Sequence, residues 1–389
     1  MADISTPTEP LLAEMTAWRR DFHRHPELGF DEHRTSAKVA ELLESFGLAV
    51  TTGVGGTGVV GVLKRGDGNA SIGLRADMDA LPISETNGFA HRSQNDGVMH
   101  ACGHDGHTSM LLGAAKHLAE HGNFSGTVVF LFQPNEENGL GAQAMLADFG
   151  PQGFEVDQVF GMHNIPGMEL GAFATRPGPL CASESLFEIE INARGGHAAL
   201  PHMGVDAITV GAEVVGALQT IVSRKLDPGL NGVVSVTEFN TDGRRNVLPG
   251  QARLSGDARA LTPEVNVQIE ARMRQIVDGI TAAHDVSGTV SYQTIFPPVI
   301  NEAEATAAAV QAARLVSNNV QPDSAPKLFS EDFAHFANAV PGCFMLMGNG
   351  TDGAHAQPLH SHDYDFNDAA LVPGSSYWVR LVEQQLPAR

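Results

Sequence analysis

The sequence predicts an α/β protein with a mixed, mostly parallel sheet, helices on both faces and an inserted ferredoxin-like βαββαβ domain. Three observations support this fold class. Short apolar runs typical of buried strands alternate with helical patterns at both ends of the chain. The middle of the chain shows strands of alternating polarity around two helices. The 389 residues also exceed what one hydrophobic core usually organises, so two domains are expected.

The first part of the chain supplies the alternating helices and strands. Residues 10–46 form a helical pattern that breaks at His25–Gly29, where proline and glycine interrupt it. A short strand is expected over Ser71–Leu74, and apolar residues recur at helical spacing over 105–120. Two continuous apolar runs are typical of strands buried on both faces of a sheet: Gly126–Phe132 and Val159–Met162. This alternation favours a largely parallel sheet covered by helices.

The middle of the chain predicts the inserted domain. Strands are expected at 186–193, 233–239, 252–258 and 289–296, and helices at 204–224 and 263–284. Thr262 and Pro263 suit the N-cap and first helical position of the second helix. The order βαββαβ is that of the ferredoxin-like split motif, so an inserted domain is expected over residues 183–296.

The last part of the chain returns to the first pattern after Pro297 and Pro298. The expected elements are a helix over 302–318, a short helix after Ser330-Glu331-Asp332, a buried strand over Cys343–Met347 and a closing helix from near Asp368. Residues 1–182 and 297–389 are therefore expected to build one domain around the insertion.

Charge and composition exclude several classes of protein. The formal charge is −21, from 24 Lys and Arg against 45 Asp and Glu, and so acidic a surface disfavours a nucleic-acid partner. No apolar run reaches the roughly 18 residues of a membrane span, and the N-terminus lacks the basic and apolar regions of a secretion signal. Three scattered cysteines form no disulfide framework. We expect a protein of the reducing cytoplasm with no membrane partner.

Residues 99–107, Met-His-Ala-Cys-Gly-His-Asp-Gly-His, carry the most information about function. They hold five potential metal donors: His100, Cys102, His104, Asp105 and His107. Thiolate, imidazole and carboxylate bind divalent metals of borderline softness, and glycine lets a loop aim several of them at one point. A polar loop before a helix is the simpler interpretation, but five donors in nine residues favour a metal site.

Further donors follow the predicted strands. Glu136 and Glu137 come after the first of the two apolar runs, His163 after the second, and His360 lies in the loop beyond the last predicted strand. In open α/β sheets ligands bind at the carboxyl ends of the strands, so these side chains are expected to converge. Two adjacent carboxylates point in different directions, so one can hold a metal while the other acts as a general base. Each of these residues alone would suit a solvated turn or a structural histidine, but together they indicate a metal centre.

Two other classes of protein remain open from the residues alone. Cys102 could be the nucleophile of a cysteine–histidine hydrolase, because cysteine near histidine is a reactive arrangement. That hypothesis leaves Glu137, His163 and His360 unexplained. The chain could also be a non-catalytic metal-binding protein that keeps the fold of an enzyme.

Eight motifs resemble those of the M20 metallopeptidase family, specifically its amidohydrolase branch of hippurate hydrolases, aminoacylases and auxin-conjugate hydrolases. They occur in the family's order at residues 19–28, 75–82, 100–107, 133–137, 161–164, 195–197, 330–333 and 358–361. The resemblance therefore spans nearly the whole chain and implies a metal-dependent hydrolase.

The resemblance implies two divalent metal ions per subunit, zinc or manganese, or else cobalt or nickel, since these donors serve them all. By motif the ligands are Cys102, which would bridge the ions, and His104, Glu137, His163 and His360. Glu136 would be the general base. Asp79 would orient a metal ligand without binding the metal itself. Broader M20 peptidases carry a ligand histidine near this position. His25, His100, Asp105 and His107 are left with structural or supporting parts.

The resemblance also gives roles to the inserted domain, which would act as lid and dimerisation domain beside the catalytic domain. His197 would stabilise the oxyanion, and in dimeric relatives this histidine reaches the partner's active site. Asn246 and Arg259 would bind the free carboxylate of the substrate, since arginine meets a carboxylate with two hydrogen bonds. A homodimer or a dimer-based homo-oligomer is therefore expected.

The implied reaction is hydrolysis of the amide bond of N-acyl amino acids, hippurate-like or acyl-amino-acid substrates, giving a carboxylic acid and a free amino acid. The nearest alternative is a dipeptidase or carboxypeptidase of the same family. Which acyl group is accepted depends on loops whose shape the sequence does not reveal.

Overall fold

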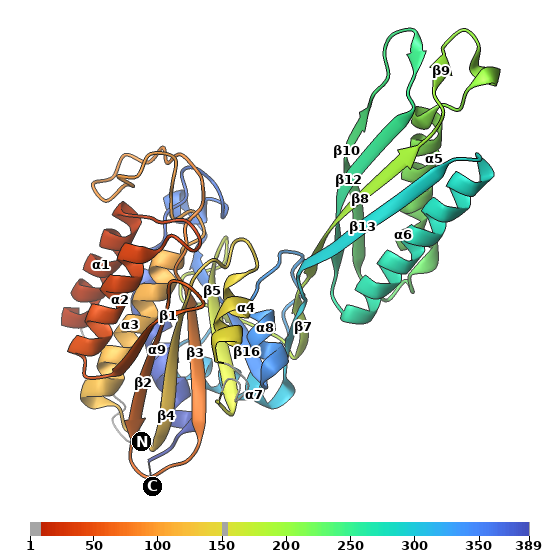
Figure 1. Ribbon diagram of the computed structural model, residues 1–389. Helices are drawn as coiled ribbons and strands as arrows, with labels where there is room; N and C mark the ends of the chain where they lie inside the picture. Colours follow the sequence, from red (N-terminus) through yellow and green to blue (C-terminus); the bar gives the residue numbers. More distant parts are fainter. Residues whose placement is uncertain (1–8, 150–154, 389) are drawn as a thin grey trace. The chain divides into compact units, whose positions relative to one another are not determined.

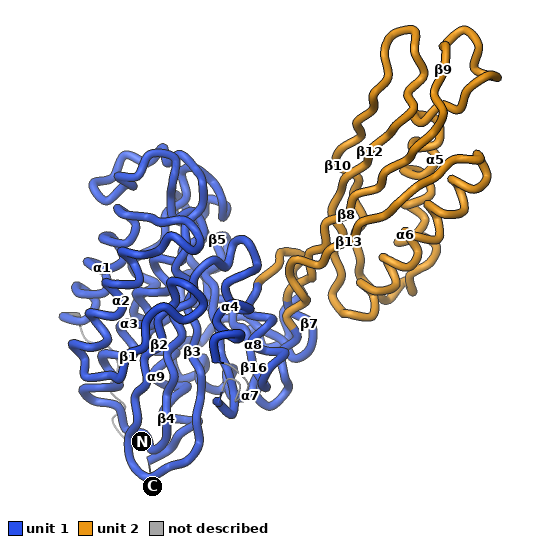
Figure 2. The backbone as a smooth tube through the Cα atoms, viewed as in Figure 1, with its two compact units in different colours: residues 1–180, 300–325, 332–389 blue, residues 181–299, 326–331 orange. Residues whose placement is uncertain are grey.

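The computed structural model describes residues 9–149 and 155–388, which divide into two compact units (Figure 2). Unit 1 comprises the chain up to Leu180, residues 300–325 and the chain from Asp332 onward. Unit 2 comprises 181–299 and 326–331. Each unit has its own hydrophobic core.

Residues 326–331 lie in unit 2, whereas the sequence pattern placed all of 297–389 in the first domain. The reason is a long-range backbone contact. The N–H of Ala182 points to the carbonyl oxygens of Lys327 and Phe329, each at 3.1 Å. Hydrophobic patterning does not register a contact of this kind, because it reads only local spacing.

Unit 1 is built on an eight-stranded mixed sheet in the order β1-β2-β4-β3-β5-β16-β6-β15 (Figure 1). The four central strands β4, β3, β5 and β16 run parallel, and β1 and β2 pair antiparallel at one edge. The mostly parallel sheet of the predicted fold class is thereby confirmed. The strands are β1 (Ala49–Val54), β2 (Gly58–Arg65), β3 (Ser71–Asp77), β4 (Gly126–Gln133), β5 (Gln158–Pro166), β6 (Phe173–Ala174), β15 (Val320–Gln321) and β16 (Gly342–Gly350).

The helices of unit 1 pack in two groups. Helix α3 lies against α1 and α9, whereas α4 lies against α8 (Figure 1). The helices are α1 (Glu9–Arg24), α2 (His33–Ser45), α3 (His104–His121), α4 (Gly141–Asp148), α7 (Ala303–Arg314), α8 (Ala334–Ala339) and α9 (Leu371–Gln385). Short 3₁₀ turns occupy Gly353–Ala356 and Asp368–Ala370. Helix α3 is buried over most of its length, which fixes the loop that precedes it.

Unit 2 has the predicted ferredoxin-like order. Its elements are β8 (Ser183–Asn192), α5 (Ala207–Thr220), β10 (Gly232–Thr241), β12 (Gln251–Ala260), α6 (Pro263–Ala283) and β13 (Ser287–Phe296). The four strands form one antiparallel sheet in the order β10-β12-β8-β13. The Thr262 hydroxyl accepts the N–H of Val265, which makes Thr262 the N-cap of α6 as its sequence position predicts.

The polarity of each strand in unit 2 explains which face the helices cover. Along β8, Phe187, Ile189 and Ile191 are buried in the core with α5 and α6. The intervening residues point to the opposite face of the sheet. Short connecting elements complete the described chain: β7 (Gly178–Cys181), β9 (Gly196–His197), a 3₁₀ turn (Pro201–Met203), a short π-helix (Ile221–Lys225), β11 (Val247–Leu248) and β14 (Val299–Asn301).

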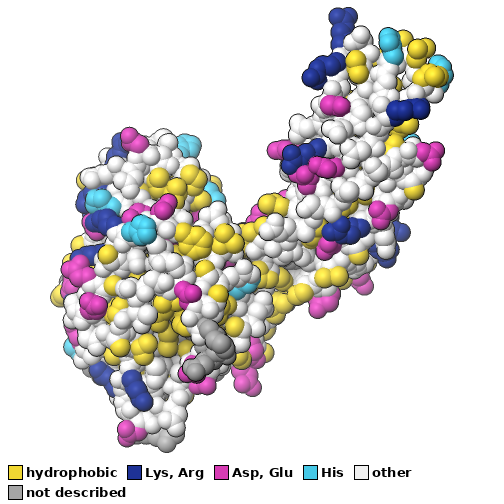
Figure 3. All heavy atoms as spheres, in the orientation of Figure 1, with side chains coloured by type: hydrophobic (Ala, Val, Ile, Leu, Met, Phe, Trp, Pro, Cys, Tyr) yellow, Lys and Arg dark blue, Asp and Glu magenta, His cyan; other side chains and the backbone are white. Residues whose placement is uncertain are grey.

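Charges of both signs and helices of limited apolar length characterise the described part of the chain. On the face drawn in Figure 3, basic side chains are scattered among acidic ones and form no continuous basic surface. Within the part of the chain that the structure describes, no helix combines the length and apolar character needed to span a membrane.

Candidate metal centre

The predicted metal donors lie where the parallel strands of unit 1 end. Glu136 and Glu137 follow β4, and His163 lies within the last half of β5 rather than beyond it, because β5 continues to Pro166. His104 is the first residue of α3, with Cys102 just before it. Adjacent parallel strands bring their carboxyl ends to one edge, so the topology of the sheet places these donors together.

The five predicted ligands form one connected cluster. The Cys102 Sγ lies 3.3 Å from Nε2 of His163. Glu137 lies between two imidazoles, with Oε1 3.9 Å from Nε2 of His104 and Oε2 3.5 Å from Nε2 of His360. Within this cluster, two groups of donor atoms lie within 4.8 Å of one another: Cys102, His104 and His163 form one, and Cys102, Glu137 and His360 the other. Cys102 is the member common to both groups, which is the arrangement that two ions sharing a thiolate require.

Two buried atoms of the cluster fit a cation. In the described part of the chain, Nε2 of His104 and Oε1 of Glu137 are buried and have no hydrogen-bond partner. Such atoms usually cost about 1–3 kcal/mol of stability when left unsatisfied. Ligand atoms on one metal ion lie about 3–4 Å apart, because each bond is about 2 Å long. The donor set therefore matches a divalent metal ion in chemistry, burial and spacing.

Both buried histidines present the same ring nitrogen to the cluster. Nδ1 of His104 lies 2.9 Å from the Asp79 carbonyl oxygen, and Nδ1 of His163 lies 2.6 Å from the Asn164 carbonyl oxygen. A carbonyl can only accept, so each Nδ1 carries a proton and donates it. Each Nε2 is thereby directed at the cluster, as in most metal-binding histidines.

Asp79 supports two of the predicted ligands. Its Oδ1 lies 3.3 Å from Nδ1 of His104, and its Oδ2 accepts the backbone N–H of Glu137 at 3.0 Å. One buried carboxylate thus orients a histidine from α3 and the turn after β4 at once. This geometry supports the orienting role proposed for Asp79 rather than a place among the ligands.

Gly103 lets Cys102 and His104 flank the start of α3. Its φ is +96°, a region that residues with a side chain rarely adopt. A Cβ at this position would lie 2.2 Å from Oδ1 of Asn164 and 2.6 Å from the Tyr364 hydroxyl. Glycine is therefore required both by the backbone conformation and by the space available.

Electrostatics of the cluster favour a bound cation over a free thiolate. Burial raises the pKa of the Cys102 thiol well above its usual value, and the charges of Glu137 and Glu136 raise it further. A thiol that stays protonated is a poor nucleophile, which argues against the cysteine–histidine hydrolase hypothesis. A metal ion would deprotonate it by direct coordination.

The two histidines respond to burial in different ways. Burial by itself lowers the pKa of His104, but the carboxylates of Asp77, Asp79 and Glu137 outweigh it and raise that pKa to about 10. For His163, burial lowers the pKa well below the usual value and leaves a neutral imidazole. The buried negative charge around His104 that favours a proton there would also favour a metal cation.

Asn164 supports the site but was missed as a site residue in the sequence. Its Oδ1 lies 2.7 Å from Nε2 of His107, whose Nδ1 lies 2.6 Å from Oδ1 of Asp77. Both ring nitrogens of His107 are thus occupied, in agreement with its predicted supporting part. Asn164 also donates from Nδ2 to the Tyr364 hydroxyl at 2.6 Å. The only sequence signal for Asn164 is its place beside His163 in a motif.

Asp105 ties the donor loop to α1 through a buried ion pair. Its Oδ2 lies 2.8 Å from Nδ1 of His23, and the other ring nitrogen of His23 lies 3.2 Å from Glu85. Burial lowers the pKa of His23, but Asp105 and Glu85 outweigh it and raise that pKa to about 9. Asp105 thus connects the first turn of α3 to α1 through His23, and its part in shaping the preceding loop stays a prediction.

The His23 pair gives a testable dependence of stability on pH. A proton held more tightly in the folded than in the unfolded protein adds stability that is complete below about pH 6.5 and is lost as the pH rises through 9. Thermal unfolding should therefore show a loss of about 1–3 kcal/mol between pH 7 and pH 9.5. His23→Gln should remove this loss, whereas His121→Gln, at an exposed histidine, should keep it. An identical pH dependence in His23→Gln would contradict the assignment.

The predicted residues of unit 2 fall at two separate places. His197 lies in β9 and Asn246 just before β11, and the Ala198 N–H donates to the Asn246 carbonyl at 3.1 Å. Arg259 lies near the far end of β12, where it pairs with Asp257 and Glu184. The eight residue steps along β12 from Gln251 to Arg259 span roughly 27 Å at about 3.4 Å each.

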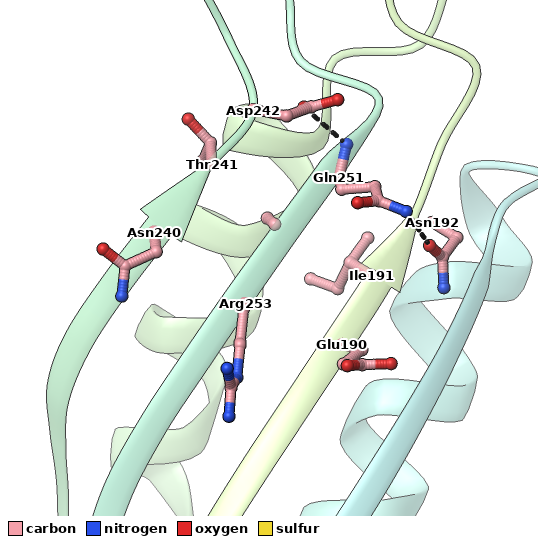
Figure 4. A pocket seen from close by; sticks show the side chains of 9 residues that line it. Glu190, Ile191, Asn192, Asn240, Thr241, Asp242, Gln251 and Arg253 are labelled. Carbon is pink, nitrogen blue, oxygen red and sulfur yellow. Dashed lines mark hydrogen bonds between the residues drawn. The ribbon is translucent and has the colours of Figure 1, made fainter.

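A hollow of about 290 Å³ lies on the helix-free face of the unit 2 sheet (Figure 4). Its labelled polar lining comes from three strands and the loop after β10: Glu190, Asn192, Asn240, Thr241, Asp242, Gln251 and Arg253. None of the described residues that line it is a histidine or a cysteine. The hollow therefore lacks the imidazole and thiolate donors that the cluster in unit 1 brings together.

The fold and the donor cluster define the class of protein, a metal-dependent hydrolase of α/β architecture. A family model described as Peptidase family M20/M25/M40 matches residues 73–384. The chain belongs to this family.

Three relatives illustrate its similarity to known proteins. It is 39% identical over 378 residues to a hippurate hydrolase of Campylobacter jejuni subsp. jejuni serotype O:2, with 97% of each chain covered. It is 36% identical over 360 residues to an N-acetyl-L-cysteine deacetylase of Bacillus subtilis (strain 168), covering 92% of this chain and 85% of the relative. The crystal structure of the Bacillus subtilis YXEP protein, described as a dinuclear metal binding peptidase from the M20 family, superposes with a TM-score of 0.85 at 31% identity, covering 98% of this chain and 100% of that one.

Proposed function

We propose that this protein hydrolyses the amide bond of N-acyl amino acids, releasing a carboxylic acid and a free amino acid. The observation that carries the proposal is the cluster at the strand ends, where Cys102 joins two groups of donors and Glu136 lies beside Glu137. The hippurate hydrolase and the N-acetyl-L-cysteine deacetylase among the relatives support the substrate class.

Two divalent metal ions per subunit would be held by Cys102, His104, Glu137, His163 and His360. The candidates are zinc and manganese, or else cobalt and nickel, because the donors suit them all. When bound, these ions would acidify water and polarise the substrate carbonyl.

The chain's own residues supply the remaining chemistry. Glu136 takes the proton from the attacking water and returns it to the leaving amine. His197 donates to the oxyanion that develops on the carbonyl oxygen. Asn246 and Arg259 bind the carboxylate of the amino-acid part, so a free C-terminal acid is preferred over an internal peptide bond.

The layout of unit 2 supports a homodimer. His197 and Arg259 belong to opposite ends of β12: His197 pairs with Val247, shortly before β12 begins at Gln251, and Arg259 lies eight strand steps further along, roughly 27 Å at about 3.4 Å per residue. An N-acyl amino acid is much shorter than this distance, so one substrate cannot touch both residues of the same chain. If both serve one site, they come from two subunits, with the inserted domain of residues 183–296 as lid and dimerisation domain and 1–182 with 297–389 as catalytic domain.

We also propose the cytoplasm as the location of the protein, since all three cysteines are free and buried.

A panel of substrates tests the proposed function. Hippurate, N-acetyl-cysteine and other N-acyl amino acids should release amine, whereas the matching C-terminal amides should react at least 10-fold more slowly because they lack the carboxylate. Chelation should abolish turnover, and one of the four metals should restore it.

Three outcomes would contradict the proposal. Faster turnover of dipeptides than of acyl amino acids would favour the dipeptidase or carboxypeptidase alternative. A metal-free protein that stays active and is blocked only by alkylation of its thiols would favour a cysteine nucleophile. Binding of metal without turnover of any amide would indicate a non-catalytic metal-binding protein.

A further inference from the structure

The turn between β4 and α4 is held by three carboxylates. This turn carries both Glu136 and Glu137. Three carboxylates accept a backbone N–H each from the turn and from the first residues of α4: Glu32 from Asn135 at 2.8 Å, Asp79 from Glu137 at 3.0 Å and Asp332 from Ala142 at 3.0 Å. Asp79 and Asp332 belong to segments already connected with the site, but Glu32 has no role so far.

Glu32 is fully buried at the start of α2 and both of its oxygens are used. Oε1 accepts the Asn135 N–H, and Oε2 accepts the Thr57 hydroxyl at 2.5 Å. A buried carboxylate is costly, so one that persists must be matched by strong hydrogen bonds. The hydrogen bonds of Glu32 connect α2 and the β1–β2 turn to the residue that precedes Glu136.

Asn135 occupies a conformation that needs outside support. Its φ is +48°, in the left-handed region, which asparagine enters more readily than most residues with a side chain but less readily than glycine. Its side chain packs against Gly29, where a Cβ would lie only 1.9 Å from Oδ1 of Asn135. The segment from Gly29 to Glu32 thus holds both the side chain and the N–H of Asn135.

We propose that Glu32 is a positioning residue for hydrolysis. By accepting the Asn135 N–H, it fixes the direction of the backbone after β4 and thereby the orientation of Glu136. This inference rests on the proposed role of Glu136 as general base. Glu136 and Glu137 are adjacent, so a rotation of the turn at Asn135 would move the base and a metal ligand together. A small misplacement of a catalytic group is enough to lower the rate strongly.

Charge on Glu32 is secondary to the hydrogen bond in this proposal. Burial and, to a lesser extent, the nearby Asp79 carboxylate raise the pKa of Glu32 to about 7, so neutral substitution at this position removes a desolvation cost. Glutamine keeps an oxygen that can accept the Asn135 N–H, and its amide can donate to Thr57. Alanine keeps neither interaction.

Kinetics and hydrogen exchange of two variants test the proposal. Glu32→Ala should lower kcat about 10- to 100-fold, as expected for loss of a hydrogen bond to a charged group, with KM within about 3-fold and metal content unchanged. Glu32→Gln should recover most of kcat. Amide exchange measured on the peptide 133–142 should speed up in Glu32→Ala and stay slow in Glu32→Gln.

Glu302→Ala is the matched control. The Glu302 carboxylate also accepts a backbone N–H, that of Ala305 at 2.7 Å, but it does so at the start of α7. This variant should lower Tm and leave kcat unchanged. If Glu32→Ala lowers only Tm, with kcat within 2-fold and unchanged exchange over 133–142, the positioning role is overturned.

Two further results keep the test decisive. If Glu32→Ala does not fold, Thr57→Val replaces it, because this variant removes only the second hydrogen-bond partner of Glu32. It should give a smaller loss of kcat and faster amide exchange over 133–142. Unchanged kcat and unchanged exchange would refute the proposal. If Glu136→Gln stays active, the proposed mechanism fails, whereas the exchange of the Asn135 amide still reports whether Glu32 holds the turn.

Discussion

Glu136→Gln is expected to lower kcat by about 10²- to 10⁴-fold while the bound metal stays unchanged. Glutamine has nearly the same shape as glutamate but cannot accept the proton of the attacking water. Glu136 is almost fully buried, and a carboxylate oxygen of it lies within 4.8 Å of donor atoms of His104 and Glu137. The measurement is turnover of an N-acyl amino acid, together with metal analysis of the purified variant.

Glu137→Gln provides the comparison for this prediction. Glu137 is a proposed ligand, so its variant should lose metal affinity together with activity, by about 10-fold or more. Comparison of the two variants thus distinguishes the role of base, proposed for Glu136, from the role of metal ligand, proposed for Glu137. Full activity of Glu136→Gln at saturating metal would show that the mechanism is wrong.

Mixing two inactive variants is expected to restore activity if His197 serves the partner's active site. His197→Ala and Glu136→Gln should each be nearly inactive alone. In a mixed dimer, the first chain keeps Glu136 and the second keeps His197, so one complete site forms. Random pairing of equal amounts makes half the dimers mixed, each with one working site of two, so about a quarter of wild-type activity should return.

Coexpression with two different affinity tags allows the mixed dimer to be isolated and assayed. The control is a mixture of wild-type chains with chains that carry both substitutions. In their mixed dimer each site lacks one of the two residues, so only the wild-type dimers, about a quarter of the total, should stay active. No recovery in the isolated mixed dimer would place His197 in its own chain's site. A monomer in solution would refute the shared site altogether.

Much of this fold was predictable because hydrophobic periodicity is local. The buried strand at Gly126–Gln133 and the capped helix at Pro263–Ala283 were predicted to within a residue or two of their ends. By contrast, β1 is mostly exposed and alternates weakly, so it shows little of the pattern that identifies a strand. Strand β5 continues past the predicted end because its last residues, with His163 among them, still pair with β16.

The proposed ligands were predictable for a different reason. Cysteine, histidine and glutamate are informative types, and the rule that ligands bind at strand ends turns sequence order into spatial proximity. The residues that hold these ligands in place are not of informative types. Asn164, Thr57 and Glu32 could stand in any polar turn, and only their contacts across the fold give them a part at the site.

By itself, the sequence determined the α/β class, the inserted βαββαβ domain, the family and a set of metal donors, because each follows from local periodicity or from residue types in a fixed order. The tertiary structure alone decided how these donors are held. Burial of Cys102, the orientation of Nε2 on His104 and His163, and the carboxylates that hold the turn of Glu136 all depend on residues far apart in the chain. Hydrogen bonds and desolvation act through space, so they become readable only when the chain is folded.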